Sequence, residues 1–163
     1  MRLAIISDTH LPKARRALPD GCVERLRDAD VILHAGDFTA PEILEQLLEL
    51  GPPVHAVHGN VDTPQLQERL PTTLEVALGA VTIGMVHDAG EARGRLRRAR
   101  LIFPDADAVI FGHSHLPLLE RDDDGFQIFN PGSPTERRRA PAHTMGLARI
   151  EDGRIAFELV TLD

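Results

Sequence analysis

Short apolar segments alternate with longer amphipathic ones in the first part of the chain. The apolar segments cover residues 3–7, 31–34 and 54–57. Continuous apolar runs of this length are typical of fully buried strands. Each of them ends in a polar cluster, and the first is followed by a loop rich in Lys and Arg at residues 11–19. Strands that alternate with helices predict an α/β fold with parallel strands.

The segments between these strands carry helix signals. Asp20 is a candidate N-cap for a helix over residues 21–27, with Val23 and Leu26 on its inner face. Thr39 and Glu42 have the spacing of a capping box, and this predicts a helix that runs through residue 50.

The pattern changes in the second half of the chain. Residues 74–78 and 81–86 are separated only by Gly79-Ala80, which predicts a hairpin. Apolar residues at helical spacing then predict an amphipathic helix between residues 92 and 103, with several arginines on its outer face. Further strands are expected, mostly antiparallel, at residues 108–111, 118–121, 126–129, 144–150 and 155–162.

Polar residues of metal-ligand type follow five of the predicted strands. They are Asp8, His10, Asp37, Asn60, His87, His113 and His115. Loops at the carboxyl ends of parallel strands meet at one edge of a sheet, where sites are built. The alternative is that these residues only form turns, but their ordered recurrence favours a metal site.

Oxygen and imidazole ligands suit manganese, iron, zinc, nickel or cobalt better than calcium. The ligand number exceeds what one four-coordinate zinc requires. Two metals about 3.5 to 4 Å apart that share one carboxylate would use all of the ligands, and this arrangement serves phosphoester cleavage.

The segment Gly112-His113-Ser114-His115 follows the strand at 108–111. In an extended segment residues i and i+2 point the same way, so both histidines are expected to project into one pocket. Gly112 is expected to let the backbone turn tightly there.

Composition limits the class of protein. The 163 residues fit a single domain, 1–163, and with 42% hydrophobic and 26% charged residues they are typical of a globular protein. No apolar run approaches the roughly 18 residues of a membrane helix. Cys22 is the only cysteine, which favours a reducing, cytoplasmic location and excludes thiolate-rich zinc sites. The net charge of −7 argues against a protein that coats nucleic acid.

The ordered motifs D-x-H, G-D, G-N-x-D, H and G-H-x-H resemble those of the calcineurin-like metallophosphoesterase superfamily. The short chain and the segment Asn130-Pro-Gly-Ser resemble the small prokaryotic phosphodiesterases, which are related to the eukaryotic retromer scaffold subunit. This resemblance implies a four-layer α/β/β/α sandwich of two mixed β-sheets flanked by helices.

The resemblance also implies the roles of the ligands. One ion would be held by Asp8, His10, Asp37 and His115. The other would be held by Asp37, Asn60, His87 and His113, with Asp37 as the bridging carboxylate. His113 and His115 would then form a fork that serves two different ions, with Ser114 pointing away. The implied cofactors are two divalent transition-metal ions, with manganese as the first choice and nickel, cobalt, iron or zinc as the others.

The implied activity is the hydrolysis of phosphoesters, small phosphodiesters in preference, by a hydroxide that bridges the two metals. The alternative is a protein-binding scaffold on the same fold with a weak or vestigial site. Members of this type often form dimers or tetramers, so a homo-oligomer is expected by analogy. The charge disfavours nucleic acid as a partner, and no membrane partner is expected.

The chain departs from the family pattern at Val61, where many members carry the histidine that is thought to protonate the leaving oxygen. His58 is a candidate substitute and, with Asn130, a candidate substrate contact. Asn60 and Asp62 are the candidate catalytic residues: Asn60 as an uncharged ligand that touches phosphate, and Asp62 as a carboxylate that ties its loop to a His or Arg. Asp88 stands where a glycine is common and is expected either to support a ligand or to be solvated. His34 is expected in the core or behind the ligands.

Overall fold

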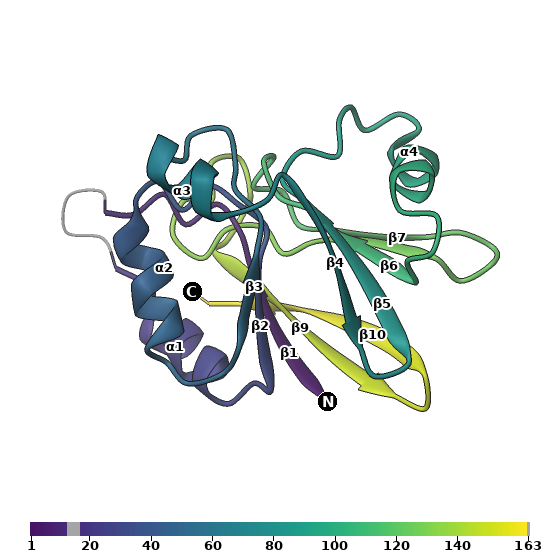
Figure 1. Cartoon of the computed structure of the whole chain (residues 1–163), viewed down its shortest axis with the longest axis horizontal. Coiled ribbons are helices and arrows are strands. Elements are labelled where there is room, and N and C mark those ends of the chain that lie inside the picture. Colours follow the sequence, from purple (N-terminus) through teal and green to yellow (C-terminus); the bar gives the residue numbers. More distant parts are fainter. Residues whose placement is uncertain (13–16, 163) are drawn as a thin grey trace.

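The computed structural model describes residues 1–12 and 17–162, so residues 13–16 of the predicted basic loop lie outside it. Two five-stranded mixed sheets pack face to face, and helices cover their outer faces (Figure 1). The chain therefore has the predicted α/β architecture of four layers.

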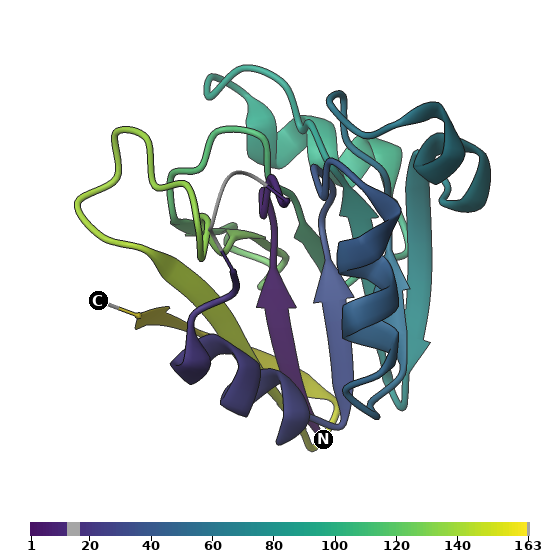
Figure 2. The same ribbon diagram turned by 90° about the vertical axis from the view of Figure 1, so that its left-hand side faces the viewer.

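The first sheet has the strand order β10-β9-β1-β2-β3. Its strands are β1 (Arg2–Ile6), β2 (Val31–His34), β3 (Val54–Ala56), β9 (Thr144–Glu151) and β10 (Arg154–Thr161). β1, β2 and β3 are parallel, as predicted, while β9 is antiparallel to β1 and β10. The helices α1 (Asp20–Arg27) and α2 (Pro41–Leu48) lie in front of β1 and β2 in Figure 2.

The second sheet has the order β4-β5-β6-β8-β7. Its strands are β4 (Thr73–Leu78), β5 (Val81–Val86), β6 (Ala108–Ile110), β7 (Leu118–Arg121) and β8 (Gln127–Asn130). β4 and β5 form the predicted hairpin, whereas β5, β6 and β8 are parallel to one another. The helix α4 (Arg95–Ile102) covers the outer face of this sheet, and the short helix α3 (Pro64–Arg69), which the sequence pattern did not predict, precedes β4.

Three apolar clusters hold the four layers together. Alternate residues of a strand face opposite sides of its sheet, and β1 shows this directly. Leu3 and Ile5 face the core between the sheets, whereas Ala4 and Ile6 face α1 and α2. A third cluster joins Phe103, at the end of α4, to Val109 of β6. Burial on both faces explains why these strands are apolar without a polar alternation.

Both predicted helix caps are wrong. The N-cap of α1 is Pro19, and Asp20 is already in the first turn. The N-cap of α2 is Ala40, without a side-chain cap bond, and α2 ends at Leu48 rather than at residue 50. Thr39 cannot cap because its own backbone has a φ of 89° and its amide donates to the Asp62 carboxylate. Within the part of the chain that the structure describes, no helix is long and apolar enough to cross a membrane.

Candidate metal centre

The seven candidate ligands lie in loops at one edge of the two sheets. Each loop follows the carboxyl end of a strand: β1, β2 and β3 of the first sheet, and β5 and β6 of the second. Six of the seven form two groups in which the potential ligand atoms lie within 4.8 Å of one another. One group is Asp8, His10 and His115, and the other is Asp37, His87 and His113.

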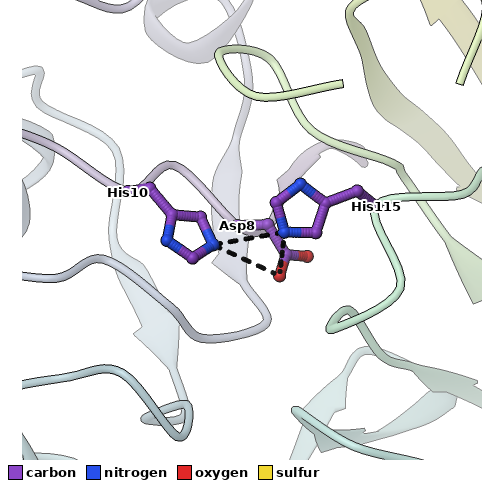
Figure 3. Close-up of side chains that lie close together, drawn as sticks. All are labelled: Asp8, His10 and His115. Carbon is purple, nitrogen blue, oxygen red and sulfur yellow. Dashed lines mark hydrogen bonds and ion pairs between the residues drawn. The ribbon is translucent and has the colours of Figure 1, made fainter. Parts of the chain in front are cut away.

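In the first group the side chains converge on one point (Figure 3). Nε2 of His10 lies 3.2 Å from Nε2 of His115, which in turn lies 3.3 Å from Oδ1 of Asp8. The Nδ1 atom of His115 contacts the carbonyl oxygen of Glu136. A carbonyl can only accept, so Nδ1 carries the proton and Nε2 presents its lone pair to the group.

In the second group Nε2 of His87 lies 3.2 Å from Oδ2 of Asp37. Its Nδ1 donates to the carbonyl of Ala35 at 2.7 Å, so a neutral His87 also presents a lone pair. Asn60 completes this group, because its Oδ1 lies 3.2 Å from Nε2 of His87 and 3.0 Å from Nδ1 of His113.

These contacts are unfavourable for neutral imidazoles, since lone pairs face oxygen acceptors. A positive charge between them removes the conflict. Burial lowers the pKa of His87, but its hydrogen bond to Asp37 and the charge of Asp8 outweigh burial and raise the pKa above its usual value. Burial raises the pKa of Asp37, but the His87 contacts outweigh it and bring the value to about 2. The donor set, with its carboxylates, imidazoles and amide, fits divalent transition-metal ions.

Asp37 lies between the two groups. Its Oδ2 is 3.5 Å from Nε2 of His10 and 3.2 Å from Nε2 of His87. Its Oδ1 accepts the backbone N–H of Val61 at 3.0 Å, which fixes the carboxylate so that Oδ2 faces both groups. This is the position that a shared carboxylate requires.

Two glycines let the backbone approach the carboxylates closely. A Cβ at Gly112 would overlap the hydroxyl of Ser7 and crowd Asp8, and a Cβ at Gly59 would overlap Asp37. Gly112 was expected to serve a tight turn. A tight turn does begin at Gly112, because its carbonyl accepts the N–H of Ser114 at 2.8 Å. Its φ is not positive, however, so glycine is required there by the close approach to Ser7 and Asp8.

The left-handed backbone occurs at the ligands themselves. Positive φ values are found at Asp8 (56°), His10 (46°), Asp37 (60°), His113 (68°) and His115 (58°). Such values are rare outside glycine and cluster at functional sites. The expectation that His113 and His115 project together from an extended segment is therefore wrong. Successive left-handed turns send them into different groups, and Ser114 turns away to accept a hydrogen bond from Asn130.

Asp62 is buried and positions the loops. Its carboxylate accepts three backbone N–H groups: those of Asp37 at 3.1 Å, Thr39 at 2.7 Å and Gly59 at 2.7 Å. The prediction that Asp62 ties its loop to a His or Arg is wrong, because the partners of its carboxylate are backbone amides. Asp62 fixes the segments that carry Asp37 and Asn60, and it does so through backbone amides, including that of Asp37 itself.

Asn130, the predicted substrate contact, is completely buried. Its Nδ2 donates to the carbonyl of Gly112 at 2.8 Å, and its Oδ1 accepts the N–H of Gly132 at 2.9 Å. Asn130 therefore holds the loop of the two histidines.

The sequence patterns did not reveal that residues 133–136 support the backbone at Asp8 and Thr9. Ser133 Oγ donates to the Asp8 carbonyl at 2.8 Å, and Thr135 Oγ1 donates to the Thr9 carbonyl at 2.6 Å. The same segment supplies the Glu136 carbonyl that orients His115. The Asn-Pro-Gly-Ser segment was the available signal, but it suggested a contact with substrate instead.

Three further expectations concern residues around the groups. His34 is buried, as expected: its Nε2 meets Thr9 Oγ1 at 3.1 Å and its ring stacks on Phe38. Asp88 is exposed, and its Oδ2 lies 4.0 Å from Nε2 of His113. Val61 is 42% exposed next to Asn60 and offers no proton.

The calcineurin-like phosphoesterase superfamily domain matches residues 1–153, and the chain therefore belongs to this superfamily. It is 34% identical to a probable metallophosphoesterase of Methanothermobacter thermautotrophicus, over 98% of this chain and 92% of the relative. It is 27% identical to a phosphodiesterase of Methanocaldococcus jannaschii, over 81% of this chain and 83% of the relative.

Among solved structures, the chain is similar to Vps29 of Entamoeba histolytica in complex with Zn²⁺. The TM-score is 0.78 with 25% identity, and the similarity covers 100% of both chains. These findings confirm the resemblance that the ordered motifs indicated. They also agree with a site that offers two groups of metal ligands.

Proposed function

We propose that this protein is a dinuclear-metal-dependent phosphoesterase that prefers phosphodiesters. The observation that carries the proposal is the place of Asp37 Oδ2, within 3.5 Å of an imidazole nitrogen of each ligand group. One carboxylate can thus serve two cations. Asp8, His10, Asp37 and His115 would hold the first, and Asp37, Asn60, His87 and His113 the second.

Two divalent cations, when bound, supply a nucleophile from water near neutral pH and neutralise charge on the phosphate. The protein contributes the fixed geometry. Ser7 Oγ and the His113 amide both donate to Asp8 Oδ2, at 2.7 Å and 3.0 Å, so its Oδ1 stays turned toward the imidazoles. Such fixed donors and ligands need no rearrangement during the reaction.

Asn60 limits the negative charge at the second group, because an amide stands where a second carboxylate beside Asp37 would repel an anionic phosphate. The amide is exposed, unlike the buried Asp8 and Asp37, so it can contact substrate. We assign it a catalytic role at this position.

The lack of a proton donor at Val61 limits the leaving group. The anion of an acidic alcohol leaves the phosphate without being protonated, whereas the strongly basic alkoxide of a simple alkyl alcohol needs a proton donor. Activated diesters should therefore be good substrates, and esters with alkyl leaving groups should be slow.

The test is hydrolysis of bis-p-nitrophenyl phosphate and p-nitrophenyl phosphate with each of manganese, nickel, cobalt, iron and zinc. The diester should be turned over faster, and Asp37→Asn should reduce kcat by at least about a thousandfold with the fold intact, since it disturbs both cations. No turnover with any of these metals would refute the proposal.

The alternative is a binding scaffold, which the similarity to Vps29 keeps under consideration. Metal analysis separates the two functions. Two tightly held ions per chain support the enzyme, whereas a protein that retains no metal after dialysis supports the scaffold.

A further inference from the structure

A pocket of about 240 Å³ adjoins the second ligand group. Asn60 and His87 line it together with Gln67 and Asp88. His58, Thr72 and Val86 form its walls. A group bonded to a phosphate at Asn60 would extend into this space.

The walls of the pocket are fixed by hydrogen bonds between the loop after β3 and the start of β4. The His58 N–H donates to the carbonyl of Pro71 at 3.1 Å. The imidazole lies with Nδ1 3.2 Å from the carbonyl of Gly59 and Nε2 3.1 Å from the hydroxyl of Thr72. Since the carbonyl requires a proton on Nδ1, Nε2 accepts from Thr72. His58 is thus held as a wall and has no free proton to give to a leaving oxygen.

The size and charge of the pocket restrict what enters it. Pockets that bury a drug-sized ligand have volumes of about 300 to 1,000 Å³, so this one takes only a ring-sized part of a substrate. Among the described residues, neither Lys nor Arg lines it, and Asp88 adds a negative charge. A second phosphate or a carboxylate would find neither a Lys nor an Arg side chain as a partner there.

We propose that the pocket formed by His58, Thr72 and Val86 is the subsite for one ester group of the substrate and selects an uncharged, ring-sized group. This inference rests on the proposed function. It makes His58 and Thr72 specificity-determining residues and predicts a preference for diesters that carry such a ring.

The probes are methylphosphonate and phenylphosphonate, which share the phosphonate head group and differ by the ring. Their affinities for the manganese-loaded protein are measured by calorimetry. Phenylphosphonate should bind about tenfold more tightly, because burial of apolar ring surface is favourable. 4-Carboxyphenylphosphonate should bind at least about threefold more weakly than phenylphosphonate, because Asp88 repels its carboxylate.

The decisive variant is Thr72→Trp, which fills the pocket from an exposed position. It should abolish the preference for the ring and leave the affinity for methylphosphonate unchanged. Thr72→Val removes the hydrogen bond to His58 but keeps the volume, so the preference should persist. Thr73→Trp is the matched control, because this exposed neighbour does not line the pocket.

The outcomes separate the two proposals. If methylphosphonate itself does not bind, the metal-centre function fails and the subsite fails with it. If methylphosphonate binds but phenylphosphonate binds no more tightly, only the subsite is overturned. A preference for the ring that survives in Thr72→Trp also overturns it, because the ring would then lie elsewhere.

Discussion

Nε2 of His87 lies 3.2 Å from Oδ2 of Asp37, and the two residues come from different sheets. His87 follows β5 of the second sheet, and Asp37 follows β2 of the first. His87 is fixed on its other side by the carbonyl of Ala35 at 2.7 Å, so its orientation does not depend on a bound ion. The His87 ring is therefore preorganised as a ligand, which favours binding of a metal.

His113 and His115 should separate the two metal sites. His113→Ala should remove one ion per chain and leave the other, because His113 belongs only to the Asp37 group. His115→Ala should do the converse. Both should reduce kcat at least about a hundredfold, since the chemistry requires both cations.

Metal content by mass spectrometry and turnover of bis-p-nitrophenyl phosphate check this prediction. His113 is exposed and His115 is buried, so only His115→Ala should also lower the melting temperature clearly. Loss of both ions in each variant would contradict the separate grouping.

Gly59 should be intolerant of any side chain. In Gly59→Ala the new methyl overlaps Asp37, so we expect a loss of about 2 kcal/mol in the free energy of unfolding. The affinity for both ions should fall as well, because Asp37 lies between the two groups. Gly21→Ala is the control, since a Cβ there meets only the end of the Arg25 side chain. Urea denaturation and metal titration give the two readouts.

Asp62 should act on the site through the backbone amides that its carboxylate holds, including that of Asp37. Asp62→Ala leaves three backbone amides without their acceptor and should cost about 3 kcal/mol of stability. Metal affinity should fall with it, while Asp62→Asn should recover part of both. Glu45→Gln, in an exposed ion pair with Arg69, should change stability by less than about 0.5 kcal/mol. Full metal affinity in Asp62→Ala would show that the loops do not need this carboxylate.

His34 should make the metal-free protein sensitive to acid. Burial, followed by repulsion from His87, lowers its pKa from 6.5 to about 3. Between these values the unfolded chain binds a proton that the folded chain excludes. Stability therefore falls as the pH drops from 6.5 toward 3, with a limiting slope of about 1.4 kcal/mol per pH unit from this group.

Urea denaturation in the presence of a chelator measures this dependence. His34→Gln should be less stable than the native chain at pH 7, because it loses contacts with Thr9 and Phe38. Its stability should nevertheless vary less between pH 6.5 and 4.5. An equally steep dependence in the variant would assign the effect to other groups.

Short-range patterns predicted the α/β fold and the seven candidate ligands, whereas the four-layer sandwich and the division of the ligands into two groups were implied by the resemblance to the superfamily. Apolar runs indicate strands buried on both faces, and parallel strands bring their carboxyl ends together. The features that the sequence did not predict depend on contacts between segments that are distant along the chain. The cap expected of Thr39 failed because Asp62 takes its amide. Asn130 was expected at the substrate and Gly112 in a turn, yet Asn130 is buried against the histidine loop and Gly112 fits against Ser7.

Each ligand group draws residues from both sheets. Asp8 and His10 meet His115 across the interface, and Asp37 meets His87 and His113. A bound ion would therefore act as a crosslink between the two halves of the sandwich, in addition to their apolar contact and to hydrogen bonds such as those from His87 to the Ala35 carbonyl and from the His113 amide to Asp8. Amide hydrogen exchange should slow on metal loading at this edge of both sheets and change little at the opposite edge, so that the ions clamp the molecule at one end only.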